Sequence, residues 1–280
     1  MSEGYTFIKK LVDNNRLLLT LQEQVLSSKY YDENLYTTIE NYVADYLKIE
    51  LIDNSSPEKI YFNFIQAYNN DMKAFIKTGK YPLAINKNIA LLSRFEYDII
   101  LLFSCLFTEH RFRIMQLINN QSSISNRGLF IGCGPGLEIE LAKEYFENLY
   151  AYDISLNNFL ITKHSKVHFK ESYFTGDKNH TNFDVIYIIE LLEHLSDPYT
   201  LIQNCQKVLS KRGKILLTTA TNIPQFDHLY NFETSHKDFE NKINNFGFSI
   251  IFKEDILHQN FTLDIGAKNR FYVLEKDIDC

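Results

Sequence analysis

The chain has 280 residues, of which 45% are hydrophobic and 23% charged, and its net charge is −6. This composition indicates a globular protein of one or two domains, and excludes a disordered or fibrous chain. Residues 1–120 carry 13 basic and 14 acidic groups, whereas residues 121–280 carry 16 and 21. The second part is therefore the acidic one, which argues against a nucleic-acid partner, because binding to phosphates normally needs a basic surface.

Targeting and cysteine patterns favour the cytoplasm. The first residues lack the basic and apolar segments of a secretory signal. The longest apolar run, residues 99–107, is too short to span a bilayer. The four cysteines show no C-x-x-C spacing, as expected for reduced thiols. We therefore expect a cytoplasmic protein without a membrane partner.

Residues 1–120 are predicted to form an all-helical domain. Apolar residues recur there at helical spacing. Residues 55–58, Ser-Ser-Pro-Glu, are typical of a helix start and open a helix over residues 60–74. A long buried helix is expected over residues 97–117, and the polar stretch 119–123 is the predicted domain boundary. We interpret this domain as a substrate-binding lid or as a contact between two copies of the chain.

Residues 121–280 are predicted to form an α/β domain with a mostly parallel sheet, because strands and helices alternate. Seven strands are expected, and the last two have no obvious helix between them. They cover residues 128–132, 149–153, 166–170, 183–189, 213–220, 247–253 and 269–275.

A glycine-rich turn follows the first predicted strand. Gly132, Gly134 and Gly136 stand at alternate positions and precede an amphipathic segment. Glycines allow positive φ angles and a close approach of a ligand to the backbone. The free N–H groups at the start of the following helix then face that ligand. The spacing differs from the dinucleotide fingerprint G-x-G-x-x-G, because the third glycine comes only two residues after the second.

An acidic residue stands at the end of the second predicted strand. Asp153 lies seventeen residues after Gly136. A carboxylate at this place can accept hydrogen bonds from both hydroxyls of a ribose. The alternative role for Asp153 is to cap the next helix. Together with the glycine turn, it predicts a site for a nucleotide-like ligand.

Four motifs in this order resemble class I S-adenosylmethionine-dependent methyltransferases. They are the glycine turn of residues 129–138, Asp153, the fourth-strand segment 182–194, and the helix end, turn and strand of residues 209–219. The resemblance covers residues 129–275 and does not specify a substrate. It implies a Rossmann-like, seven-stranded methyltransferase sheet whose last strand is antiparallel, with S-adenosylmethionine as cofactor.

The resemblance also implies which residues bind the donor. They are Gly132, Gly134, Gly136, Asp153, Ile154, Ser172, Tyr173 and Glu190. Ile154 would pack against the adenine. Relatives often have an aspartate where Tyr173 stands, so a side-chain acceptor for the adenine amino group is absent here. Backbone atoms around Ser172 are the alternative.

A Glu-x-x-Glu-His segment follows the fourth predicted strand. Glu190, Glu193 and His194 would share one face of a helix, and His228, after the fifth strand, is expected over the same pocket. Such residues can bind Mg²⁺, Mn²⁺, Fe²⁺ or Zn²⁺. The pattern resembles the metal-dependent branch of the superfamily, which includes small-RNA 2′-O-methyltransferases and quinone-pathway O-methyltransferases.

The same residues also occur in metal-free methyltransferases, where they shape the pocket. In that case His228 or His194 is the candidate general base, because a neutral imidazole accepts a proton near pH 7. Arg111 and Arg113, expected at the end of the long helix, could hold a substrate or cofactor carboxylate. The alternative for both is a favourable position near the negative end of the helix dipole.

Three hypotheses for the function follow. The leading one is methyl transfer from S-adenosylmethionine to an oxygen or nitrogen of a small molecule. The second is a metal-dependent RNA 2′-O-methyltransferase, which the acidic charge disfavours. The third is a catalytically inactive protein that binds the donor, which the retained glycines, Asp153 and both histidines disfavour.

Overall fold

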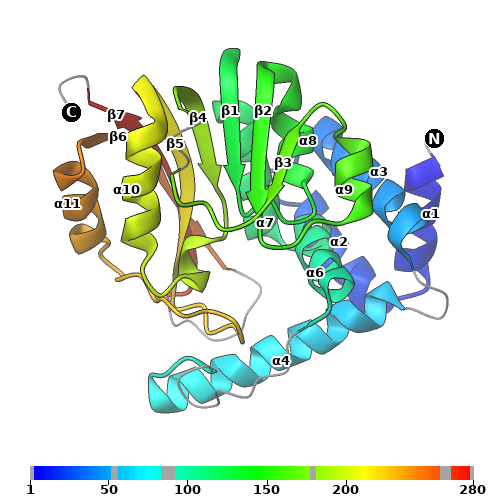
Figure 1. Ribbon diagram of the computed structural model, residues 1–280. Coiled ribbons are helices and arrows are strands. Elements are labelled where there is room, and N and C mark those ends of the chain that lie inside the picture. Colours follow the sequence, from blue (N-terminus) through cyan, green and yellow to red (C-terminus); the bar gives the residue numbers. More distant parts are fainter. Residues whose placement is uncertain (1–2, 52–55, 83–91, 177–180, 259–265, 278–280) are drawn as a thin grey trace.

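The protein is described by a computed structural model that covers residues 3–51, 56–82, 92–176, 181–258 and 266–277. Its centre is a seven-stranded sheet with the order β3-β2-β1-β4-β5-β7-β6 (Figure 1). The strands are β1 (Ser125–Ile131), β2 (Phe146–Asp153), β3 (His168–Glu171), β4 (Phe183–Ile188), β5 (Leu209–Thr221), β6 (Phe248–Leu257) and β7 (Lys268–Lys276). All neighbouring pairs are parallel except those of β7, which is antiparallel to both β5 and β6. The predicted Rossmann-like sheet with an antiparallel last strand is confirmed.

The part of the chain before β1 is helical in its described residues, as predicted. Its helices are α1 (Glu3–Asp13), α2 (Arg16–Leu26), α3 (Glu33–Glu50), α4 (Pro57–Thr78), α6 (Arg94–Phe107) and α7 (Glu109–Gln121). The expected start of α4 is present, since the Ser56 hydroxyl accepts from the Lys59 N–H and Pro57 is the first helical residue. Gly79, in the left-handed conformation, ends the helix.

The expectation of one long helix over residues 97–117 is wrong. The chain forms two helices, α6 and α7, separated by Thr108. Thr108 adopts an extended backbone, with φ −133° and ψ 131°, and its hydroxyl donates to the Ser104 carbonyl at 2.7 Å. This side-chain bond competes with the continuation of the helix. As a result Arg111 lies in the first turn of α7, and its interpretation as a helix-end cation is also wrong.

Helices cover both faces of the sheet, and alternate strand residues supply the two hydrophobic clusters. On one face, Phe130, Ala151 and Tyr187 pack with the N-terminal helices and with α8 (Leu137–Ala142) and α9 (Asn158–Lys163). On the other face, Leu129 and Ile186 pack with α10 (Pro198–Val208) and α11 (Lys237–Asn245). The N-terminal helices therefore form part of the hydrophobic core that covers one face of the sheet (Figure 1). The predicted boundary at residues 119–123 falls at the end of α7, and the division into two domains stays a prediction.

Helix α4 crosses the edge of the sheet at which the parallel strands end (Figure 1). Its Tyr68 and Met72 are buried against Ala220, near the end of β5, and against Ile223. Ligands of such sheets bind beyond the carboxyl ends of the strands. The helix thus forms a wall above the edge where a site is expected.

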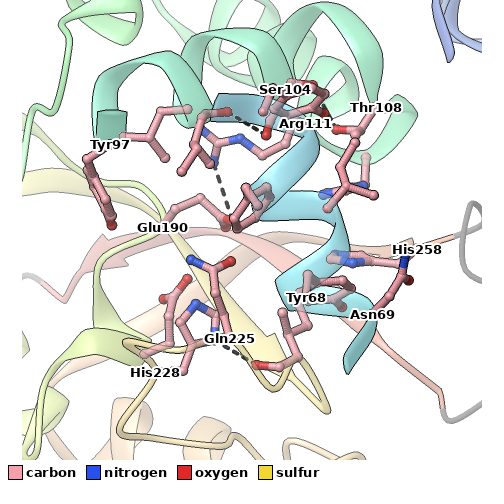
Figure 2. Close-up of a pocket in the computed structure, with 18 of the residues that line it drawn as sticks. Tyr68, Asn69, Tyr97, Ser104, Thr108, Arg111, Glu190, Gln225, His228 and His258 are labelled. Atoms are coloured by element: carbon pink, nitrogen blue, oxygen red, sulfur yellow. Dashed lines mark hydrogen bonds and ion pairs between the residues drawn. The ribbon is translucent and has the colours of Figure 1, made fainter. Parts of the chain in front are cut away.

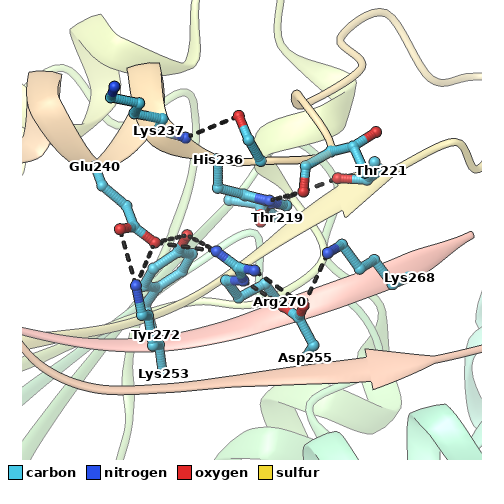
Figure 3. Close-up of polar contacts among 12 residues, drawn as sticks. Thr219, Thr221, His236, Lys237, Glu240, Lys253, Asp255, Lys268, Arg270 and Tyr272 are labelled. Atoms are coloured by element: carbon cyan, nitrogen blue, oxygen red, sulfur yellow. Dashed lines mark hydrogen bonds and ion pairs between the residues drawn. The ribbon is translucent and has the colours of Figure 1, made fainter. Parts of the chain in front are cut away.

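A polar network fastens the last two strands to α11 (Figure 3). Arg270 of β7 donates to Glu240 of α11 at 3.0 Å and pairs with Asp255 of β6. Nearby, the fully buried His236 lies 2.8 Å from the Thr219 hydroxyl of β5. These contacts fix the antiparallel end of the sheet. None of the described helices is both long and apolar enough to cross a membrane.

Candidate active site

The glycine turn adopts the conformation that its sequence predicts. Gly132, Gly134 and Gly136 have φ angles of 69°, 49° and 83°, a region that favours glycine. The Gly132 N–H donates to the Tyr152 carbonyl at 2.8 Å, which ties the turn to β2. Gly132 and Gly134 line a large cavity at the carboxyl ends of the strands. Their backbone is thus available to a ligand.

Gly136 serves packing instead. A Cβ atom here would lie 2.2 Å from the Leu160 side chain and 2.9 Å from the Tyr42 hydroxyl. Gly136 does not line the cavity among the described residues. The residue therefore allows α9 and α3 to approach the turn, and its contact with the donor stays a prediction.

Asp153 lies at the end of β2, within reach of the glycine turn. Its carboxylate accepts from the Gly134 N–H at 2.9 Å and from the Ser155 N–H at 3.0 Å. Arg94 of α6 donates to it at 3.3 Å. The carboxylate is 9% exposed and lines the cavity. The turn and the acid therefore form one structural unit, as the ribose-site prediction requires.

The large cavity has a volume of about 670 Å³ and brings most of the predicted donor residues together. Ile154 and Tyr173 are 62% and 73% exposed and lie at its rim. Ser172 also lines it, and its buried hydroxyl has no hydrogen-bond partner among the described residues. A ligand with hydrogen-bonding groups can satisfy this hydroxyl.

A second cavity of about 320 Å³ adjoins the first (Figure 2). Helix α4 supplies an aromatic wall, formed by Tyr61, Phe64 and Tyr68. The two cavities share the residues Tyr97, Leu101, Arg111, Glu190 and His194. Two ligands can therefore lie side by side and meet at these shared residues.

Glu190 does not begin a helix, so the expected helical face with Glu193 and His194 is wrong. Its φ is 49°, and only Leu192–His194 form a short 3₁₀ turn, η2. The Glu190 carboxylate accepts from the Asn269 amide at 2.8 Å. It also lies 3.3 Å from the Arg111 guanidinium, a contact that Figure 2 shows. Glu190 thus points toward the junction of the cavities, apart from the other three predicted metal ligands.

Glu193, His194 and His228 do come together. One ligand atom from each residue lies within 4.8 Å of the others. The Glu193 carbonyl accepts from the Leu229 and Tyr230 N–H groups at 2.8 and 2.9 Å, which anchors the loop that carries His228. The two imidazole rings are 4.9 Å apart, edge to face. Three of the four metal ligands predicted from the sequence therefore come together.

The surroundings orient both imidazoles. Nδ1 of His228 lies 2.8 Å from the Ile223 carbonyl, and Nδ1 of His194 lies 3.3 Å from the Asp227 carboxylate. A proton on each Nδ1 leaves Nε2 as an acceptor. Burial lowers the pKa of His228 well below its ordinary value, so this ring is neutral near pH 7.

Glu193 is a buried carboxyl group that its surroundings compensate only in part. Burial, and next the charge of Glu190, raise its pKa well above the ordinary value. Its Oε2 atom has no hydrogen-bond partner among the described residues. A buried polar atom of this kind is costly unless a ligand, a water molecule or an ion satisfies it. Nitrogen and carboxylate donors at this spacing fit a divalent transition metal.

Arg111 stands in the wall between the cavities. It is 5% exposed, and its Nε and Nη1 atoms have no hydrogen-bond partner among the described residues, although Glu190 and Glu138 lie 3.3 and 3.7 Å from the guanidinium. Of the two predicted carboxylate binders, only Arg111 reaches the site, because Arg113 pairs with Glu254 of β6 at 2.7 Å. Buried donors beside a cavity are suited to an anionic group.

Three residues of the site were not predicted from the sequence. Arg94 and Tyr97 come from α6, far from the motifs, and no local pattern marks them. Asp227 precedes His228 directly in the sequence. Its contact with His194 depends on how the loop folds back onto η2.

Comparisons with known proteins agree with this geometry. Residues 107–243 match the family model described as a methyltransferase domain. Similar curated proteins are the ubiquinone biosynthesis O-methyltransferases of Idiomarina loihiensis, 29% identical over 102 residues, and of Coxiella burnetii, 26% identical over 113 residues. These matches cover 32% and 38% of this chain, and the chain spans only 41% and 48% of those relatives.

Solved structures are similar at lower identity. One is the 1,6-didemethyltoxoflavin-N1-methyltransferase of Burkholderia thailandensis, with a TM-score of 0.49 and 12% identity, covering 68% of this chain and 93% of that one. Another is the N-methyltransferase NodS of Bradyrhizobium japonicum in complex with S-adenosyl-l-homocysteine, with a TM-score of 0.45 and 17% identity, covering 59% and 86%. The expectation of a methyltransferase is confirmed by the family match of residues 107–243 and not by these structures.

Proposed function

We propose that this protein transfers the methyl group of S-adenosylmethionine to an oxygen or nitrogen atom of a small molecule. The observation that carries the proposal is the pair of adjoining cavities. The larger one contains the glycine turn and Asp153, and the smaller one contains the two histidines. The donor occupies the first and the acceptor the second, and the methyl group passes between them.

The donor's ends match the two ends of the larger cavity. The Asp153 carboxylate accepts from the ribose hydroxyls, and Ile154 and Tyr173 flank the adenine. At the other end, Arg111 lies between Glu138 and Glu190. One guanidinium and two carboxylates suit a group that bears both a carboxylate and an ammonium, such as the methionine end of the donor.

The smaller cavity suits a compact acceptor with apolar surface. Its volume is about 320 Å³, and both the aromatic wall of α4 and the polar group of Glu193, His194 and His228 line it. Such a pocket buries an apolar body and leaves one polar atom at the reacting end. The acidic charge of residues 121–280 also favours a small molecule over RNA.

Positioning and proton removal are the chemical tasks of the site. The sulfonium of the donor is already a good leaving group, so alignment of acceptor, methyl and sulfur supplies much of the acceleration. In the absence of a bound ion, Nε2 of His194 or His228 accepts the proton of the acceptor hydroxyl or amine. Burial lowers the pKa of His228, which keeps this ring neutral near pH 7 and also makes it a weaker base than a free imidazole.

A divalent ion is the alternative to a histidine base. Glu193, His194 and His228 would hold it, and Asp227 and the Ile223 carbonyl would orient the two rings. When bound, the ion supplies a positive charge that lowers the pKa of an acceptor hydroxyl. Mg²⁺, Mn²⁺, Fe²⁺ and Zn²⁺ remain candidates, and the two imidazoles favour the last three.

Oxygen is the favoured acceptor atom, because the similar curated proteins are named as O-methyltransferases. The test supplies the protein with methyl-labelled S-adenosylmethionine and either a small-molecule extract or total RNA. We expect label in a small molecule. Ile65→Trp, which fills the smaller cavity, should abolish transfer while leaving the affinity for S-adenosylhomocysteine unchanged. Label in RNA alone, or transfer that Ile65→Trp does not alter, would contradict the proposal.

A further inference from the structure

Arg94 of α6 contacts both halves of the proposed donor site. Its Nη1 donates to the Asp153 carboxylate at 3.3 Å and also to the Ser155 carbonyl. Its Nη2 donates to the Gly134 carbonyl at 2.6 Å. One guanidinium thus joins the glycine turn, the predicted ribose acceptor and the segment that follows β2.

The guanidinium is itself held from the helical side. Arg94 Nε donates to Asp98, one turn further along α6, at 3.0 Å. Asp98 is fully buried and also accepts from the Tyr46 hydroxyl at 3.0 Å and from the Asn157 amide at 2.7 Å. A buried carboxylate with several donors has little freedom to move. Arg94 therefore reaches the donor site from a rigid anchor.

A second contact from the N-terminal helices supports the same turn. The Tyr42 hydroxyl of α3 donates to the Pro135 carbonyl at 2.7 Å and lies 3.1 Å from Nε2 of the buried His164. Two successive carbonyls of the glycine turn, those of Gly134 and Pro135, thus accept bonds from two different N-terminal helices. Bonds to these carbonyls fix the direction of the peptide groups between them.

We propose that Arg94 is a positioning residue of the donor site, which fixes the Asp153 carboxylate and the glycine turn in the arrangement that binds the ribose. The inference rests on the proposed function, since it assigns the ribose to Asp153. Preorganised acceptors bind more tightly because no ordering is needed when the ligand arrives. The N-terminal helices are then part of the donor site as well as a wall of the acceptor cavity.

The alternative is that Arg94 competes with the ribose for Asp153. The Asp153 carboxylate already accepts from two backbone N–H groups as well as from Arg94. If the guanidinium blocked the ribose, its removal would tighten donor binding. If it positions the carboxylate, its removal weakens binding. The two roles therefore predict opposite signs for the same variant.

The experiment is a calorimetric titration of the full chain with S-adenosylhomocysteine and with its 2′,3′-dideoxy analogue. Arg94→Met should weaken binding of S-adenosylhomocysteine about 10- to 100-fold, as expected for lost charge-assisted hydrogen bonds. The analogue cannot use Asp153, so its already weaker binding should change by less than about 3-fold on the same substitution. Arg94→Lys keeps a charge beside Asp98 and should lose less affinity than Arg94→Met.

Arg113→Met is the matched control. It removes a guanidinium that makes a two-bond pair with Glu254, at 2.8 and 2.7 Å, away from both cavities. We expect it to leave the affinity for S-adenosylhomocysteine unchanged. If Arg94→Met does not fold, Arg94→Lys is used for the test. We then expect Arg94→Lys to lose more affinity for S-adenosylhomocysteine than for the analogue.

Three results would overturn the proposal. They are an unchanged or higher affinity of the Arg94 variants for S-adenosylhomocysteine, an equal loss for both ligands, and the same loss in Arg113→Met. A failure of the proposed function would give a different result from a failure of the Arg94 proposal, because the folded wild-type protein would then bind neither ligand.

Discussion

The backbone carbonyl and the carboxylate of Asp227 both lie 3.3 Å from Nδ1 of His194 and orient the imidazole toward His228 and Glu193. A second bond keeps the carboxylate in place, because Gln225 donates to it at 3.0 Å. An acid that holds one ring nitrogen leaves the other free to accept a proton or an ion. The arrangement makes Asp227 the residue on which the reactivity of His194 depends.

Asp227→Asn should lower the rate of methyl transfer about 10- to 100-fold, because the amide no longer favours the Nδ1–H form of His194. Affinity for S-adenosylhomocysteine should stay within about 3-fold of the wild-type value, since neither end of the donor is assigned to Asp227. The measurement is kcat with the labelled small-molecule acceptor, together with calorimetry. An unchanged kcat in Asp227→Asn would contradict the role of this pair.

A divalent ion should bind at Glu193, His194 and His228. We expect titration of the metal-free protein with Zn²⁺ or Mn²⁺ to show one site, and His228→Ala to weaken it about 100-fold or more. His236→Asn removes another buried histidine, which contacts Thr219 of β5 and is not among the three ligand residues, and is the matched control. Equal ion affinity in His228→Ala and the wild type would show that any ion binds elsewhere.

Gly136 should be far more sensitive to substitution than Gly79. Gly136→Ala places a Cβ 2.2 Å from Leu160 and strains a φ of 83°, so we expect a loss of about 2–4 kcal/mol in the free energy of unfolding. Gly79→Ala has a similar φ, 66°, but meets no atom within 4 Å, and should lose only about 1 kcal/mol. Urea unfolding of both variants measures the difference, and equal losses would contradict the packing role of Gly136.

Acidification should destabilise the fold through buried histidines. Burial lowers the pKa of His236 to about 4 in the folded state, from an ordinary value of 6.5. Between these values the unfolded chain binds more protons, so the free energy of unfolding falls as pH drops from 6.5 to 4. His236 contributes at most about 3 kcal/mol to this fall in the free energy of unfolding.

The check is the free energy of unfolding at pH 7 and pH 4.5 for the wild type and for His236→Asn. Asparagine tolerates the positive φ of 54° at this position. The variant should be less stable at pH 7, because the bond to Thr219 is lost, and should lose less stability on acidification. An unchanged pH dependence would mean that His236 takes no part in it.

The strands and the donor motifs were predictable because local patterns determine them. Each of the seven predicted strands is present, and the glycines of the turn have the positive φ angles that their type and spacing suggested. Asp153 lies where a strand-end acid must lie in a parallel sheet. These features depend on residues that are close together in the sequence.

The errors and omissions depend on contacts between distant segments. The helix break at Thr108 rests on a side-chain bond that hydrophobic spacing does not reveal. Glu190 leaves the expected helical face because Arg111 and Asn269 hold its carboxylate. Arg94 is 59 residues from Asp153 along the chain, so only the packing of α6 on the sheet brings the two together.

The central claim is that the glycine turn and Asp153 bind an adenosyl donor. Its most direct test is calorimetric titration of the folded wild-type protein with S-adenosylhomocysteine, repeated with Asp153→Ala. We predict one binding site in the wild type and a loss of affinity of about 10-fold or more in the variant. The absence of binding to the folded wild-type protein, or equal affinity in Asp153→Ala, would contradict the account.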